Sequence, residues 1–172
     1  MSKNKSLTKR LCRAGVIAAL YVALTYAFMP FAFGPFQIRP AEALCILPLF
    51  FPDSIPALFI GCMLSNIASP YAVYDVTIGG AATLLAALGT FGIGKLFKKD
   101  WVKILLGGLF PVLINAFVIP LVIVFFCGGG EGYTSAFVAY LAYVGSLFLT
   151  ETVWVYALGT PLYFGVKRLL KA

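Results

Sequence analysis

The residues that could do chemistry begin with the carboxylates, because the chain has six acidic residues and no histidine. Glu151 stands out, since apolar residues precede it at 147–149 and follow it at 153–155. An ionisable group in so apolar a segment is a candidate functional group by default. At about 100° per residue it shares a helix face with Tyr140, Tyr143, Leu147 and Trp154. We predict that Glu151, Trp154 and Tyr143 contact a ligand; the alternative is an acid that bonds a neighbouring helix.

Two further acids lie near predicted helix starts. Glu42 follows Arg39 by three residues, and Asp75 ends the loop that Ser69 opens. Either carboxylate could meet the free N–H groups of a helix start, and Arg39 could pair locally with Glu42. Because Arg39 and Glu42 are expected to face one outer vestibule, we favour a role in binding substrate for both. For Asp75, helix capping and substrate contact both stay open.

Two amides, Asn66 and Asn115, lie in apolar segments. Asn115 lies between Pro111 and Pro120, and prolines free backbone carbonyls and can open a cavity. Buried amides join helices or bind ligands, and both interpretations stay open for these two. The remaining acids are expected at turns or in a glycine-rich loop, exposed to water or capping a helix: Asp53, Asp100 and Glu131.

Signatures of catalysis and cofactor binding are missing from the sequence. Without histidine, no Ser-His-Asp or Cys-His arrangement is possible, and the four cysteines lack zinc-ligand spacing. No phosphate-binding G-x-x-x-x-G-K-[ST] loop occurs. We therefore predict no enzymatic activity, no metal and no cofactor. If the protein moves a solute at the expense of ATP, another subunit must bind the nucleotide.

The composition indicates which elements position these side chains. Hydrophobic residues make up 62% of the 172 residues, charged residues make up 11%, and the mean hydropathy is +0.99; soluble domains have about 25% charged residues. This excludes a soluble enzyme and a nucleic-acid-binding domain, and predicts one integral membrane domain over 1–172. The basic residues cluster beside apolar runs at 3–13, 95–103 and 167–171, which is the positive-inside pattern.

Counting spans between the basic clusters predicts six transmembrane helices with both termini cytoplasmic. A span needs about 20 residues to cross about 30 Å of hydrocarbon, and an even number of spans must separate clusters on one side. Prolines and glycines place the boundaries, with an outer loop at 30–40. The second helix is short, so we expect protein to cover it in an all-α, cavity-lining bundle. The predicted helices cover about 10–29, 41–51, 54–68, 76–96, 102–126 and 135–168.

Small residues recur every four positions in the first predicted helix. Ala14 and Ala18 form one such row, and Gly15 and Ala19 begin another. Such rows let a second helix approach closely. The helix that approaches belongs either to this chain or to a partner subunit, and the length of the row near the cytoplasmic end favours a partner.

Motifs in the first two thirds of the chain resemble the QueT family. The resemblance extends through chain length, the six-helix plan and the basic N-terminus to nearly the whole chain. The motifs end before residue 102, so the resemblance does not cover Glu151. Its predicted role is based only on its position in an apolar segment. The matching motifs are Ile38-Arg39-Pro40-Ala41-Glu42-Ala43-Leu44 with Leu47-Pro48, Ile55-Pro56-Ala57-Leu58-Phe59-Ile60-Gly61-Cys62 with Ser65-Asn66, and Tyr74-Asp75-Val76 with Gly79 and Ala82-Thr83-Leu84-Leu85-Ala86-Ala87.

QueT proteins are substrate-binding S components of energy-coupling factor transporters, a class of ABC importer. The resemblance implies an S component in the plasma membrane of a prokaryote that captures a queuosine precursor, a 7-deazaguanine, at the outer face. It implies three partners, a transmembrane T subunit contacted by Ala14 and Ala18 and two cytosolic ATPases. Two alternatives stay open: an S component for another vitamin or heterocycle, and a membrane accessory or scaffold protein.

Overall fold

A computed structural model describes residues 2–33 and 37–171, with side chains from residue 7 onward. Every regular element within these ranges is helical. The chain begins with α1 (Ser2–Ala27), α2 (Met29–Ala32), the 3-10 helix η1 (Pro40–Leu49) and α3 (Ser54–Asn66). It continues through α4 (Ala72–Tyr74), η2 (Asp75–Gly79) and α5 (Gly80–Leu96), then α6 (Asp100–Leu121) and η3 (Val122–Phe126), and finally α7 (Ala136–Thr152), η4 (Val153–Leu158) and α8 (Gly159–Lys171).

All six predicted helical segments are present, but they differ in reach. Among the described residues, four helices are long and apolar enough to cross a membrane: Leu7–Ala27, Ala72–Leu96, Asp100–Phe126 and Ala136–Lys171. The other two, η1 and α3, are shorter; the 13 residues of α3 extend only about 20 Å at about 1.5 Å per residue. Helix α2 also forms inside the predicted loop at 30–40, of which residues 34–36 lie outside the described residues.

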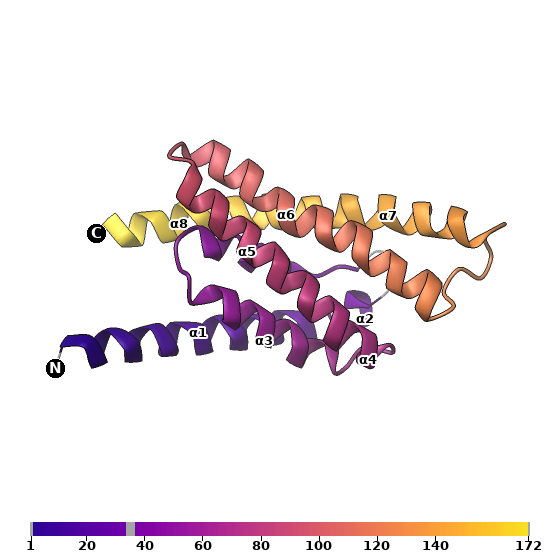
Figure 1. Ribbon diagram of the computed structural model, residues 1–172, viewed down its shortest axis with the longest axis horizontal. Coiled ribbons are helices and arrows are strands. Elements are labelled where there is room, and N and C mark those ends of the chain that lie inside the picture. Colours follow the sequence, from indigo (N-terminus) through magenta and orange to yellow (C-terminus); the bar gives the residue numbers. More distant parts are fainter. Residues whose placement is uncertain (1, 34–36, 172) are drawn as a thin grey trace.

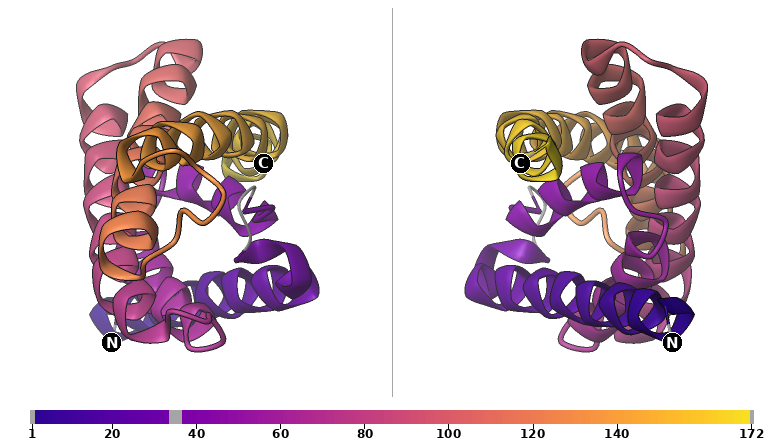
Figure 2. Two further views of the ribbon diagram at one scale, coloured as in Figure 1. Left: turned by 90° about the vertical axis from the view of Figure 1, so that its right-hand side faces the viewer. Right: turned by 90° about the vertical axis from the view of Figure 1, so that its left-hand side faces the viewer.

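The short helix η1 lies inside a ring of longer helices (Figure 2). All ten of its residues are buried, and it contacts α1, α3, α5, α6, α8 and η4. The prediction that protein covers the second helix is therefore confirmed. In a 3-10 helix, residues three apart lie above one another. Glu42 and Cys45 therefore lie one above the other on the same side of η1, and Arg39, the residue before η1, approaches Glu42 from outside the helix.

Glycine allows α1 and α3 to approach closely. A Cβ atom at Gly61 would lie 2.9 Å from the Cβ of Tyr21 and 3.2 Å from the carbonyl oxygen of Ala18. Ala14 and Ala18 are half-buried against the same core, whereas the second row of small residues, Gly15 and Ala19, is exposed. The row of Ala14 and Ala18 thus packs within the chain, whereas the row of Gly15 and Ala19 faces outward.

Both termini and the turn between α5 and α6 lie at one end of the molecule, opposite α2, α4 and the loop after η3 (Figure 1). At the terminal end, Arg13 donates two hydrogen bonds of 2.6 Å to Asp53, and Lys167 pairs with Asp100. Asp53 is buried and its side chain caps no helix. The sequence had suggested a hydrated or capping carboxylate there, and the structure has an ion pair instead.

Candidate ligand-binding site

Buried polar side chains from several helices converge on Glu42. Tyr21 of α1 donates its hydroxyl hydrogen to Oε1 at 2.5 Å, and the Cys45 thiol donates to Oε2 at 3.2 Å. The amide of Asn115, from α6, donates to the same Oε2 at 3.5 Å. Nε of Arg39 lies 3.8 Å from Oε1. A carboxylate that is 1% exposed is thus surrounded by donors, as buried charge requires.

A second branch of hydrogen bonds runs from Arg39 to the end of α3. Its guanidinium donates to Oδ1 of Asn66 at 3.2 Å and to the Tyr21 hydroxyl at 3.4 Å. The Asn66 amide donates in turn to the backbone carbonyl of Asp75 at 2.7 Å and to the sulfur of Cys62 at 3.3 Å. The loop before η2 is therefore joined to the same group of side chains.

A third branch reaches Glu151 through Asn115. The amide of Asn115 donates to Glu151 Oε1 at 3.3 Å, so that this amide lies between two carboxyl groups. Glu151 is 2% exposed. We call the connected set the Glu42 cluster; its members are Tyr21, Arg39, Glu42, Cys45, Cys62, Asn66, Thr83, Asn115 and Glu151.

Two buried atoms of the Glu42 cluster lack a hydrogen-bond partner among the side chains that the structure describes. They are Nε of Arg39, a donor, and Oε2 of Glu151, an acceptor. Leaving a buried polar atom unpaired costs about 1–3 kcal/mol. A hydrogen-bond acceptor near Arg39 Nε and a donor near Glu151 Oε2 would satisfy these two atoms.

The structure brings together five of the predicted site residues, namely Arg39, Glu42, Asn66, Asn115 and Glu151. In the part of the chain that the structure describes, the side chains of the other three form no hydrogen bond with these five. Asp75 joins the cluster through its backbone carbonyl while its carboxylate accepts from Ser69. Trp154 and Tyr143 are half-buried, and the Tyr143 ring lies 6.1 Å from that of Tyr133.

Trp154 lies beside the most buried face of its helix. That face passes through Leu147, Glu151 and Val155, all of them buried, while Trp154 is half-buried. At about 100° per residue, a residue four positions after Glu151 lies closer to its face than a residue three positions after it. Contact of Trp154 with a ligand stays a prediction.

Four members of the cluster were absent from the sequence prediction: Tyr21, Cys45, Cys62 and Thr83. Tyr21 had a detectable signal, because it lies on one helix face with Ala14, Ala18 and the buried Thr25. Cys45 had one as well, since it follows Glu42 by three residues. For Cys62 and Thr83 we find no sequence signal beyond small polar character.

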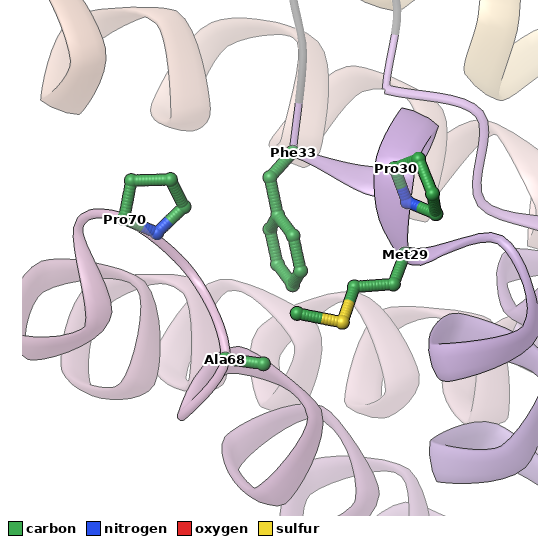
Figure 3. Close-up of a pocket in the computed structure, with 5 residues that line it drawn as sticks. All are labelled: Met29, Pro30, Phe33, Ala68 and Pro70. Carbon is green, nitrogen blue, oxygen red and sulfur yellow. The ribbon is translucent and has the colours of Figure 1, made fainter.

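An apolar pocket of about 410 Å³ opens at the end of the molecule opposite the termini. Its walls are Met29, Pro30, Phe33, Ala68 and Pro70, and Figure 3 shows the Phe33 ring between Pro70 and Met29. The same ring lies 5.9 Å from the Arg39 guanidinium. Phe33 therefore lines this pocket and also lies beside Arg39 of the Glu42 cluster.

This fold and this site define a class of protein, an α-helical membrane protein with a cluster of hydrogen-bonded polar groups buried between its helices. The chain belongs to the QueT transporter family, whose sequence profile matches residues 11–168. The resemblance seen in the motifs is thereby confirmed.

One relative carries the name queuosine precursor transporter QueT and comes from Lactococcus lactis subsp. cremoris (strain MG1363). It is 37% identical over 101 residues, which are 57% of this chain and 59% of the relative. The chain thus spans about three fifths of the length of that relative. No solved structure matches the chain.

Proposed function

We propose that this protein captures a queuosine precursor, a 7-deazaguanine, as the substrate-binding S component of an energy-coupling factor importer. Membership of the QueT family and the name of the Lactococcus relative support the substrate. In this proposal a transmembrane T subunit and two cytosolic ATPases complete the transporter. The chain contains no phosphate-binding G-x-x-x-x-G-K-[ST] loop, so a partner supplies the nucleotide site.

The observation that carries the proposal is the unpaired donor and acceptor in the Glu42 cluster. A 7-deazaguanine presents a ring N–H and an exocyclic amine beside a carbonyl oxygen. Oε2 of Glu151 can accept from the N–H groups, and Nε of Arg39 can donate to the carbonyl. Phe33, beside Arg39, supplies a flat apolar face for the ring system.

The charge distribution supports capture from the outer side of a prokaryotic plasma membrane. The described basic side chains at 9–13, 95–103 and 167–171 belong to the end that carries both termini, which the positive-inside rule assigns to the cytoplasm. The pocket around Phe33 lies at the other end. In the proposed topology η1 and α3 complete six crossings, with their short backbones shielded by the long helices.

The exposed face of α1 supports a partner helix. Gly15 and Ala19 are exposed between Leu11, Val16 and Leu20, which are 63%, 59% and 47% exposed. Small residues flanked by apolar ones let a helix in lipid approach closely. We assign the contact with the T subunit to this face. Ala14 and Ala18, which are half-buried against α3, contribute at its edge.

The test is mass spectrometry of small molecules retained by the purified protein, followed by calorimetry with the compound that is found. Glu151→Gln should weaken binding of a 7-deazaguanine at least about tenfold, since a hydrogen bond to a charged group contributes about 1.5–3 kcal/mol. Glu131→Gln, the same change at an exposed loop residue, should leave the affinity unchanged. A different retained heterocycle, or equal affinity of the two variants, would contradict the proposal.

A further inference from the structure

We infer that the turn between α5 and α6 binds the headgroup of an anionic phospholipid. We call residues 95–103 the basic turn, because four lysines lie in this short stretch: Lys95, Lys98, Lys99 and Lys103. The inference goes beyond the proposed function, since it depends on the position of the helices in a membrane and not on the ligand.

The lysines of the basic turn have no acidic partner of their own. Asp100 is their neighbour in sequence, but α8 occupies both of its carboxylate oxygens. The Tyr163 hydroxyl donates to Oδ1 at 2.8 Å, and Lys167 donates to Oδ2. In the part of the chain that the structure describes, no ion pair joins Lys98 or Lys99 to a carboxylate.

The other acids of the chain cannot replace Asp100 as partners. Asp53 is bonded to Arg13, and two acids are buried in the Glu42 cluster. Asp75 begins η2 and Glu131 lies in the loop after η3, and both elements belong to the end of the molecule opposite the basic turn (Figure 1). The basic turn therefore has an excess of positive charge, which attracts an anion.

Helix length places the basic turn at the level of the lipid headgroups. The apolar helix that starts at Asp100 continues to Phe126 and has 27 residues, which extend about 40 Å at about 1.5 Å per residue. The hydrocarbon core of a bilayer is about 30 Å thick, and the bilayer with its headgroups is about 40–45 Å thick. The start of α6 therefore reaches the layer that contains the lipid phosphates.

Exposed apolar side chains favour this level over water. Leu96 and Trp101 are 76% and 69% exposed, and Phe97 is exposed between them. The Trp101 ring lies 5.7 Å from the ring of Phe164 in α8, and tryptophan is typical of the boundary between headgroups and hydrocarbon. Apolar side chains beside lysines match a phospholipid, which offers acyl chains beside a phosphate, better than they match free phosphate.

Lys98 and Lys99 are the side chains that we assign to the headgroup. Lys95 has another role, because its Nζ lies 4.5 Å from the centre of the Phe91 ring and a cation is favourable in the last turn of a helix. Lys103 is half-buried, whereas Lys98 and Lys99 are exposed. A headgroup phosphate can accept charge-assisted hydrogen bonds from both of their ammonium groups.

Native mass spectrometry of the full chain in detergent tests the site with two lipids. Dioleoyl phosphatidylglycerol is anionic, and dioleoyl phosphatidylcholine has the same acyl chains without net charge. The wild type should bind the anionic lipid at least about tenfold more tightly, which is about 1.4 kcal/mol. The double variant Lys98→Gln, Lys99→Gln should lose most of this preference. Equal binding of the two lipids by the wild type would overturn the inference.

The matched control removes two positive charges from the same end of the molecule. Lys9→Gln, Arg10→Gln changes α1, which lies on the other side of the molecule from the basic turn (Figures 1 and 2), and leaves Asp53 bonded to Arg13. This variant should keep the wild-type preference. Equal losses in the two double variants would mean general attraction to a basic protein and would overturn the site.

Two further measurements separate a lipid from a free anion. Inorganic phosphate at constant ionic strength should not displace the bound phosphatidylglycerol, and displacement would contradict a lipid site. Trp101→Ala should weaken phosphatidylglycerol binding more than Phe117→Ala, which removes a half-exposed ring from the same helix. Equal effects of these two variants would contradict the placement of Trp101 at the headgroup level. No heterocycle enters these experiments, so failure of the inference leaves the proposed function intact.

Discussion

The hydroxyl of Tyr21 donates a hydrogen bond to Oε1 of Glu42 at 2.5 Å and accepts one from Arg39 at 3.4 Å. This tyrosine is fully buried and belongs to α1, the helix whose exposed face we assign to the partner subunit. One side chain therefore connects the proposed ligand site to the helix that we propose as the partner contact.

Replacing Tyr21 by phenylalanine removes that connection at nearly constant volume. Glu42 then loses a donor, and the free energy of unfolding should fall by about 1–3 kcal/mol. Thermal unfolding in detergent measures the loss. The matched control is Tyr26→Phe on the same helix, because the Tyr26 side chain is exposed and its hydroxyl donates to the Leu64 carbonyl at 3.4 Å. Equal losses in the two variants would contradict the role of the Tyr21 hydroxyl.

Asn115 holds two carboxyl groups apart through one amide. Asn115→Leu should destabilise the protein by about 1–3 kcal/mol or more, because both carboxyl groups lose a donor in a buried site. The same substitution should be less harmful in a Glu151→Gln background, where the repulsion between the acids is gone. A double-mutant cycle on unfolding free energies measures the difference. Strictly additive losses would show that the amide does not couple the two acids.

Gly61 sets the distance between α1 and α3. Gly61→Ala places a methyl group 2.9 Å from the Cβ of Tyr21, and such overpacking costs about 1–3 kcal/mol. At Gly92, a Cβ atom would meet nothing within 4 Å. Gly92→Ala should therefore be neutral or stabilising, since alanine favours a helix over glycine by about 1 kcal/mol. We expect the unfolding midpoint to rise in the order Gly61→Ala, wild type, Gly92→Ala. A reversed order would contradict the close packing of α1 against α3 at Gly61.

The pair of Arg13 and Asp53 predicts a pH dependence of stability. Hydrogen bonding to Arg13 holds the pKa of the Asp53 carboxyl below its ordinary value, whereas in the unfolded chain that pKa is about 3.9. The stabilisation is therefore present above about pH 4 and is lost as the pH falls through the lower folded pKa. Asp53→Asn should unfold at a lower temperature than wild type at pH 6, and the gap should narrow toward pH 3. If the difference in unfolding temperature between Asp53→Asn and wild type stays constant from pH 6 to pH 3, the ion pair is not its source.

The orientation in the membrane can be tested with single cysteines. In a Cys12→Ser, Cys127→Ser background, Lys98→Cys should react with an impermeant maleimide only after the cells are opened. Glu131→Cys should react in intact cells, because it lies in the loop at the opposite end. Labelling of position 98 from outside would overturn the topology and with it the outer position of the ligand site.

The sequence is most informative where polarity conflicts with its surroundings. Glu151, Asn115 and Glu42 could be predicted to lie together because an acid or amide in an apolar segment needs a partner, and the structure joins the three by hydrogen bonds. Tyr21 lacks this contrast, since tyrosine is common in membrane helices and its partner is 21 residues away. Trp154 is half-buried beside the face that carries Glu151, so its predicted contact with a ligand stays a prediction.

The positions of the helices could also be predicted from local sequence features. Proline and glycine positions identify all six helical segments, because they interrupt hydrogen bonding locally. The character of η1 was not predictable: a 3-10 helix of ten residues is uncommon, and contacts with six surrounding elements hold it in place. Local preferences therefore locate the helices, and packing decides how far each one reaches.

The 3-10 form of η1 also restricts how this protein can change during evolution. Each residue of such a helix turns the chain by about 120°, so Glu42 and Cys45 keep their common direction only while their spacing stays a multiple of three. Inserting or deleting one residue between them would rotate one side chain by about a third of a turn and separate the Cys45 thiol from the Glu42 carboxylate. Between these two residues, the length of the chain is therefore constrained as well as its sequence.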